Sequence, residues 1–231
     1  PIAPEVLQDM LEAASRASTC GNMQLYSLIV TQSRELREAL APCHFNQPMV
    51  TQAPCVITVC ADVHRFSMWC EQRDAEPCYD NFAWFLNGAT DALLAAQNLC
   101  VEAEAHGLGI CYLGTTIYTA EEIARILDLP KGVIPVTTIV VGHPDESPEL
   151  TDRLPLDAVV HCEKYHHYTS SEIDELWAEK ETSEETRRLL EENGLPNLAQ
   201  IFTRNRYRAE DNLAISRNYF ALLKKQGFFN N

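Results

Sequence analysis

The chain opens with an amphipathic helical pattern that ends in a small polar loop. A proline begins this pattern, and Val6, Met10 and Ala14 fall on one face of the predicted helix. The loop at 17–24 reads Ala-Ser-Thr-Cys-Gly-Asn-Met-Gln, and the apolar stretch 25–31 after it predicts a buried strand. Ser, Thr, Gly and Asn commonly form turns, but closely spaced N–H groups, hydroxyls and amides also suit a flat polar ligand. Both interpretations are open on this stretch alone.

Three further apolar runs predict strands at 54–61, 110–113 and 133–142. The longest helical pattern spans 81–106, where apolar residues recur at three- and four-residue steps until Gly107 ends the helix. Many residues of its apolar stripe are small. Small side chains permit close helix packing, so this helix is expected to pack against a sheet or a second subunit.

Two shorter helices complete the pattern of the first 145 residues. Ser33 is expected to cap a helix that ends near residue 40. Thr119 is expected to cap a helix over 120–127, with Glu122 in capping-box position. The sequence therefore predicts several helices around a sheet of short strands.

The composition changes after about residue 170. Residues 172–192 carry nine acidic and three basic residues on a helical pattern, which predicts one solvated, charged helix. A basic cluster at 204–208 and a final amphipathic helix at 212–226 follow. We therefore expect a core domain over 1–168 and a helical C-terminal arm over 169–231.

Composition narrows the function classes. Hydrophobic residues make up 46% and charged residues 22% of the chain, which is typical of a soluble globular protein. No apolar run approaches the roughly 20 residues of a membrane-spanning helix, and no secretory signal is visible, so a cytoplasmic protein is expected. Residue 1 is Pro rather than Met, which leaves a removed leading segment open.

Charge and cysteine content exclude further classes. The net charge of −15 argues against binding to nucleic acid, whose phosphates require lysine and arginine. The chain has nine cysteines and no CxxC pair. We interpret them as reduced thiols that pack as small hydrophobic groups, in preference to a disulfide framework or a zinc site. No metal ligand set is predicted.

Four polar islands lie beside predicted strand ends: 18–24, 46–47, 112–116 and 152–153. Each has an ordinary explanation when taken alone: a turn, a loop amide, a glycine bend, and a surface arginine paired with Asp152. Together they suit a ligand with a planar face, polar edges and an anionic tail. Amides can form hydrogen bonds with the polar edges, glycines allow the ligand to approach the backbone closely, and arginine binds phosphate.

These islands, in this order and spacing, resemble the FMN-dependent nitroreductase family, in particular its NADPH-preferring, oxygen-insensitive branch with a long C-terminal arm. The similarity covers roughly residues 1–165. The stretches that carry it are 17–24, Asn46-Gln47, Val59-Cys60-Ala61-Asp62, Gly107-Leu108-Gly109, Tyr112-Leu113-Gly114, Val141-Gly142-His143-Pro144, Arg153-Leu154-Pro155 and His161.

The resemblance implies an α+β fold, with a mixed, mostly antiparallel central sheet flanked by helices, built as an intertwined homodimer with the arm packed on the dimer. It implies FMN as cofactor and NAD(P)H as co-substrate. The flavin would carry the chemistry, so no catalytic side chain is predicted. The cofactor-binding residues it implies are Ser18, Thr19, Cys20, Asn22, Gln47, Tyr112, Leu113, Gly114 and Arg153.

The implied activity is ping-pong hydride transfer from NAD(P)H to a small aromatic acceptor such as a nitroaromatic, a quinone or a flavin. The family's Arg-Ser-x-Arg segment does not occur here, and Thr151 stands where a basic residue is often found. Either the chain continues before Pro1, which we expect, or the protein holds flavin poorly. The alternatives are a dimeric flavin-binding protein with weak or no turnover, and a relative that performs reductive dehalogenation or flavin fragmentation.

Overall fold

The computed structural model describes residues 1–230, which form two compact units. The first unit combines Pro1–Asp145 with the C-terminal residues from Ile215, and the second is Glu146–Ala214. Whether a functional boundary lies at residues 168 and 169 stays a prediction. Among the described residues, no helix is both long and apolar enough to cross a membrane.

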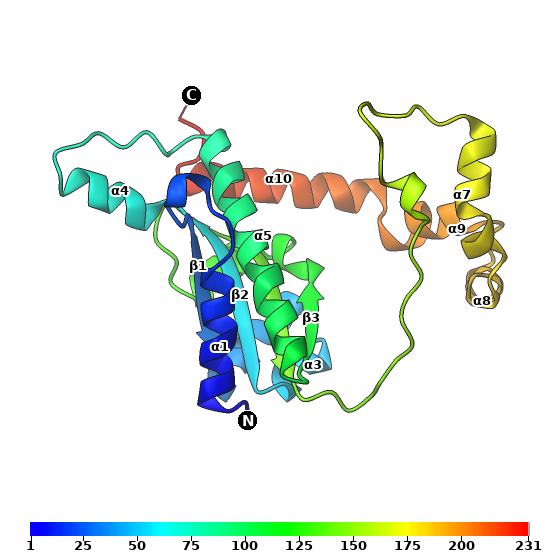
Figure 1. Ribbon diagram of the computed structural model, residues 1–231, viewed down its shortest axis with the longest axis horizontal. Coiled ribbons are helices and arrows are strands. Elements are labelled where there is room, and N and C mark those ends of the chain that lie inside the picture. The colour runs from blue at the N-terminus through cyan, green and yellow to red at the C-terminus, as the bar shows by residue number, and fades with distance from the viewer. Residues whose placement is uncertain (231) are drawn as a thin grey trace. The chain divides into compact units, whose positions relative to one another are not determined.

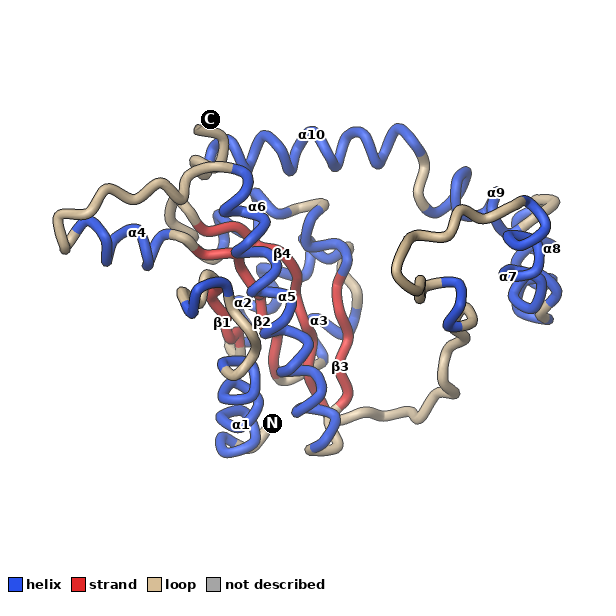
Figure 2. Tube along the Cα trace, turned by 45° about the horizontal axis from the view of Figure 1, so that its top comes forward, coloured by secondary structure: helices blue, strands red, loops and turns tan. Residues whose placement is uncertain are grey.

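A four-stranded sheet forms the centre of the first unit (Figure 2). Its strands are β1 (Tyr26–Thr31), β2 (Cys55–Asp62), β3 (Gly109–Leu113) and β4 (Val133–Gly142), in the spatial order β1-β2-β4-β3. Each neighbouring pair is antiparallel. This confirms the α+β class with an antiparallel sheet, and it makes β1 and β3 the two edges.

Helices cover both faces of this sheet. On one face lie α1 (Pro4–Ser15) and α5 (Phe82–Ala105), packed against alternate residues of β2 such as Ile57 and Val59 (Figure 1). Since side chains alternate along a strand, Val56 points to the other face. That face is covered by α2 (Arg34–Leu40), α3 (Pro48–Gln52) and α6 (Ala120–Ile126). All eight residues of β2 are buried, as its unbroken apolar run predicts.

Two further helices border the core. Helix α4 (His64–Glu71) follows β2 and was not predicted from the sequence. Helix α10 (Ala209–Lys225) ends in the first unit, where Leu222, Leu223 and Phe228 pack with Phe85 of α5. The predicted final amphipathic helix is thus confirmed, and its last turns are part of the core.

The second unit holds α7 (Ser170–Thr182), α8 (Glu184–Asn193) and α9 (Leu198–Ile201). The prediction of one continuous acidic helix is wrong. Ser183 has extended backbone angles, and its hydroxyl accepts a hydrogen bond of 3.1 Å from Thr186 N, so it caps α8 and separates the two helices.

The capping box expected at Thr119 and Glu122 is also wrong. Glu122 forms an ion pair with Arg125 on its own helix, and the Thr119 hydroxyl donates instead to the carbonyl oxygen of Cys43 at 2.7 Å. A real capping box occurs at Thr169 and Glu172, before α7. The expected cap at Ser33 is confirmed.

We predict that Gly88→Ala lowers the free energy of unfolding by about 1 kcal/mol, although alanine favours helices. A Cβ at Gly88 would lie 3.0 Å from the carbonyl oxygen of Leu25 and 3.2 Å from Cβ of Ala61, because α5 approaches the sheet closely there. Urea unfolding measures the change. The exposed Thr90→Ala on the same helix is the control and should be neutral; a more stable Gly88→Ala protein would contradict the close approach.

Candidate functional site

A buried carboxylate organises the polar loop that leads into β1. Asp91, on α5, accepts hydrogen bonds from the Thr19 hydroxyl at 2.5 Å, from Cys20 N at 2.9 Å and from Leu25 N at 3.2 Å. Its side chain is almost fully buried. The sequence analysis missed Asp91, although it is the only charged residue between Phe82 and Val101 and lies in the apolar stripe of the helix.

The loop turns through left-handed backbone angles and leaves its polar groups accessible. Gly21, Asn22 and Gln24 have φ values of 55°, 56° and 51°. The Gln24 amide nitrogen donates to the backbone oxygen of Asn22 at 2.6 Å and to its Oδ1 at 3.1 Å. Ser18, Cys20 and Asn22 are exposed. The loop is therefore internally braced, with several polar groups facing outward.

A second polar group lies where the short helical turn Ala41–His44 leads into α3. Phe45 and Asn46 both have left-handed backbone angles, with φ values of 55° and 54°. They precede Gln47, which is the N-cap residue of α3. The carboxamide of Gln47 is half-buried and forms no hydrogen bond with any residue of 1–230. It is therefore available to a ligand.

The end of β3 lies beside this turn. The buried side chain of Leu113 packs with Val50 of α3, and the next residue, Gly114, is exposed. A Cβ on Gly114 would meet no atom within 4 Å, so its backbone borders open space. His44 Nδ1 lies 2.9 Å from the Thr115 hydroxyl, and this contact connects the Gln47 turn to the Gly114 turn. Gln47, Leu113 and Gly114 thus belong to one cluster.

Tyr112 points away from this cluster, because neighbouring residues of a strand face opposite sides. Its pKa is raised by partial burial and by a hydrogen bond with the Cys100 side chain on α5. The phenol thus lies on the α5 face of the sheet, whereas Leu113 lies on the face of α2, α3 and α6. The structure separates two residues that the sequence analysis grouped together.

The loop at 18–22 and the Gln47 cluster lie at opposite edges of the sheet. The loop precedes edge strand β1 and is bonded to α5, whereas Gly114 follows the other edge strand, β3. Within one chain the eight predicted residues of the first unit therefore do not line a single slot.

Arg153 lies in the second unit, in a stretch without regular structure. Its guanidinium donates to the Thr151 hydroxyl at 2.6 Å and to the backbone oxygen of Asp152 at 2.8 Å. The Asp152 carboxylate is bonded to Lys180 instead, at 2.8 Å and 3.0 Å. The ordinary interpretation of Arg153 as the ion-pair partner of Asp152 is therefore wrong.

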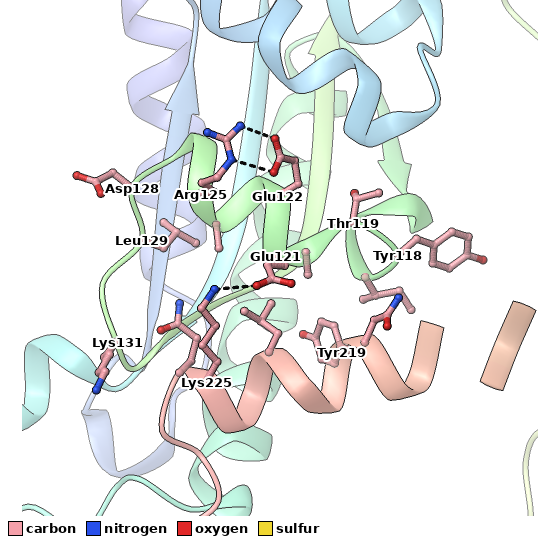
Figure 3. Close-up of a pocket in the computed structure, with 16 residues that line it drawn as sticks. Tyr118, Thr119, Glu121, Glu122, Arg125, Asp128, Leu129, Lys131, Tyr219 and Lys225 are labelled. Atoms are coloured by element: carbon pink, nitrogen blue, oxygen red, sulfur yellow. Dashed lines mark hydrogen bonds and ion pairs between the residues drawn. The ribbon is translucent and has the colours of Figure 1, made fainter. Parts of the chain in front are cut away.

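A separate cavity of about 750 Å³ lies between α6 and the end of α10 (Figure 3). Its charged groups are largely matched within its own wall. Glu121 is bonded to Lys225 at 2.7 Å, and Glu122 is paired with Arg125. None of the nine predicted site residues lines this cavity. Its paired charges give little attraction for an anionic cofactor, so the candidate site is elsewhere.

The comparisons with known proteins agree on one family. A model described as Nitroreductase family matches residues 1–143. A protein named NADPH-dependent oxidoreductase from Staphylococcus aureus (strain USA300) is 35% identical over 170 residues, which cover 72% of this chain and 67% of the relative.

Solved structures are similar over almost the whole chain. A crystal structure of a presumed oxidoreductase from Bacteroides fragilis shares 50% sequence identity with this chain, with a TM-score of 0.97. The match covers 99% of this chain and 93% of the Bacteroides fragilis chain. The NADPH:FMN oxidoreductase from Vibrio harveyi, complexed with NAD+, shares 26% identity with a TM-score of 0.81, and covers 100% and 92%.

We predict that Asp91→Asn lowers the free energy of unfolding by about 2 kcal/mol, because an amide nitrogen cannot accept the hydrogen bonds that the buried carboxylate accepts. Hydrogen exchange at the Cys20 and Leu25 amides should become faster, since both donate to Asp91. The exposed Glu104→Gln, on the same helix, is the control. Unchanged exchange at both amides would show that Asp91 does not hold the loop.

The free energy of unfolding should decrease as the pH is lowered from 6.5 toward 4, because His44 takes up a proton in this range only in the unfolded chain. This side chain is fully buried, and burial lowers its pKa to about 4 from its ordinary value of 6.5. The contribution to stability is complete above pH 6.5 and is lost as the pH falls toward 4, because only the unfolded chain takes up the proton there. The loss amounts to about 3 kcal/mol.

The measurement is the free energy of unfolding against pH for the wild type and for His44→Asn, which cannot titrate. The two profiles should diverge between pH 6.5 and 4, because only the wild type carries an imidazole at this position that titrates in this range. Parallel profiles for the wild type and His44→Asn would contradict the buried neutral imidazole.

Proposed function

This chain belongs to the nitroreductase family and is an NAD(P)H-dependent oxidoreductase, and we propose that it binds FMN and reduces nitroaromatics, quinones or flavins. The observation that carries the proposal is the open backbone at Gly114 beside the unpartnered carboxamide of Gln47. A flat ring can approach a glycine backbone closely, and a free amide can bond to its polar edge.

The residues of both clusters fit FMN. Gln47 offers an amide, Leu113 an apolar contact, and Gly114 an uncovered backbone. The loop supplies exposed polar groups at Ser18, Cys20 and Asn22, and it is held in shape by the bonds between Thr19 and Asp91. We assign Arg153 to the phosphate, because a guanidinium holds phosphate oxygens in a fork. Tyr112 faces α5 and would act at the rim of the site.

Bound in this site, FMN would supply two-electron redox chemistry between a reduced nicotinamide and the acceptor. The protein binds and orients the ring and the acceptor, and it excludes water from between them. It needs no side-chain acid or base for this work. The name of the Vibrio harveyi protein includes both NADPH and FMN, which supports the same pair of ligands here.

A homodimer would bring the two clusters together. Since they lie at opposite edges of one sheet, we propose that the loop of one chain and the Gln47 cluster of a second chain form each site. Helix α5 supports this arrangement, because Leu86, Leu93, Leu94 and Val101 are 43–56% exposed and follow helical spacing on one side. An apolar stripe of this kind fits a second copy of the chain.

A dimeric flavin-binding protein without turnover is the second candidate. It is favoured by Thr151, whose hydroxyl engages Arg153 at 2.6 Å where many relatives of the resembled branch carry a cation. Positive charge near a flavin stabilises its reduced form, so fewer cations would slow reduction. We propose a cytoplasmic location for either form.

We predict that the purified protein with FMN is yellow, is bleached by NADPH in the absence of oxygen and is recoloured by a quinone. Absorbance near the visible flavin bands measures each step. A yellow protein that NADPH does not bleach would support the second candidate, a flavin-binding protein without turnover. A protein that does not bind added FMN would contradict both candidates.

Replacement of Arg153 tests the phosphate assignment. Arg153→Ala should weaken FMN binding by at least about tenfold, because a charge-assisted bond to phosphate is lost. Arg187→Ala is the matched control, since within residues 1–230 the Arg187 side chain bonds only to the backbone oxygen of Thr182. Equal FMN affinity for Arg153→Ala and the wild type would remove Arg153 from the site.

The α5 stripe predicts the oligomeric state. The wild type should elute as a dimer, and Leu93→Glu with Val101→Glu should produce monomers, because the buried charges would face the partner's apolar stripe. Light scattering with size-exclusion chromatography measures the mass. A dimer that survives both substitutions would show that α5 lies outside the interface.

A further inference from the structure

His44 ends the helical turn that leads to Gln47 and faces the turn that follows β3. It is fully buried, three residues before Gln47, and its Nδ1 lies 2.9 Å from the hydroxyl of Thr115, the residue after Gly114. A second bond runs parallel to this one, from the Thr119 hydroxyl to the Cys43 carbonyl oxygen at 2.7 Å. These two bonds join the segment before α3 to the segment after β3.

The Gln47 turn is held in its shape by local bonds and is tied to its surroundings by His44. Two successive non-glycine residues, Phe45 and Asn46, hold left-handed backbone angles, which cost conformational free energy and persist only where the surroundings enforce them. The turn is closed by backbone bonds from Asn46 N to the Ala41 carbonyl oxygen at 2.9 Å and from Gln47 N to the His44 carbonyl oxygen at 3.1 Å. These bonds set the shape of the turn, whereas the His44 imidazole ties it to Thr115, the residue after Gly114.

The polar character of His44 is itself costly. Its Nε2 is buried and has no hydrogen-bond partner within residues 1–230, so an apolar side chain of similar size would avoid a desolvation penalty at this place. Within residues 1–230, the only hydrogen bond of the His44 side chain is the one to Thr115. This bond joins the segment that carries Gln47 to the segment that carries Gly114.

We propose that His44 is a positioning residue for the flavin ring. Through Thr115, its imidazole fixes the distance between the Gln47 carboxamide and the open backbone of Gly114, so that both reach one ring at once. This inference rests on the proposed FMN site. It predicts that loss of the bond lowers the affinity for FMN and changes the environment of the bound ring, with a smaller effect on the stability of the protein.

The test is FMN binding by isosteric variants of the full chain, followed by quenching of flavin fluorescence. Thr115→Val should raise the Kd for FMN about tenfold and shift the visible absorption of the bound flavin toward that of free FMN. Thr115→Ser, which keeps the hydroxyl, should stay within about twofold of the wild type. Thr31→Val is the matched control, because Thr31 is also buried, at 2% exposed against 9% for Thr115, and its hydroxyl has no partner in the described part of the chain.

A second pair of variants keeps the test decisive if Thr115→Val does not fold. An asparagine at 44 places its amide oxygen near the position of Nδ1, whereas a glutamine reaches toward Nε2. His44→Asn should therefore bind FMN more tightly than His44→Gln, and equal affinities would overturn the proposal. Thermal unfolding without FMN is measured for each variant.

The outcomes separate the two levels of the argument. If Thr115→Val lowers the unfolding temperature but leaves the Kd and the flavin spectrum unchanged, His44 serves the fold alone and the positioning role is refuted. If the wild type binds FMN and is reduced by NADPH while Thr115→Val equals it in Kd, the proposed function stands and only this inference fails. A wild type that binds no FMN overturns both.

Discussion

The geometry of the four-stranded sheet constrains everything that this protein can do. Its order, β1-β2-β4-β3, sends the loop at 18–22 to one edge and the Gln47 cluster to the other. The two middle strands are almost entirely buried between helices, so no ligand can reach across them inside one chain. We propose that a flat cofactor that uses both groups is held by two chains, with the apolar stripe on α5 as the surface for the second chain.

Buried polar groups hold both halves of the candidate site in shape. Asp91 gathers a hydroxyl and two backbone N–H groups of the loop, and His44 with Thr115 connects the turns of the other cluster. Each is taken out of water, where an unmatched polar group is costly. The bonds that Asp91 and His44 Nδ1 form therefore favour one arrangement of the loops, and the exposed polar groups beside them stay available for binding.

Much of the fold could be predicted from the sequence because its signals are local. The alternation of short apolar runs with helical patterns located all four strands, α5 and the first and last helices. The capping box at Thr119 could not be judged in this way, because the Thr119 hydroxyl reaches Cys43, 76 positions away. The sequence did not predict the break at Ser183, because the charge pattern continues across it. A serine is nevertheless a common N-cap residue and could have indicated the start of a second helix.

The site was only partly predictable for the same reason. Residue types marked the exposed loop and the glycine after β3, but the pairing of His44 with Thr115 and of Asp91 with Thr19 depends on contacts between distant segments. The side chains of Tyr112 and Leu113 lie on opposite faces of the sheet because they are neighbours in a strand. This could have been inferred once β3 was assigned. The separation of the two groups by the sheet required the strand order.

Mixing two defective chains tests most directly whether each site combines residues of two copies. Ser18→Trp blocks the loop, and Gly114→Leu places a side chain in the open space beside Gly114, where a Cβ meets no described atom within 4 Å. Neither variant alone should bind FMN, but dimers reassembled from an equal mixture should recover about a quarter of the wild-type FMN sites, one in each mixed dimer. No recovery in a mixture that demonstrably exchanges subunits would contradict the account.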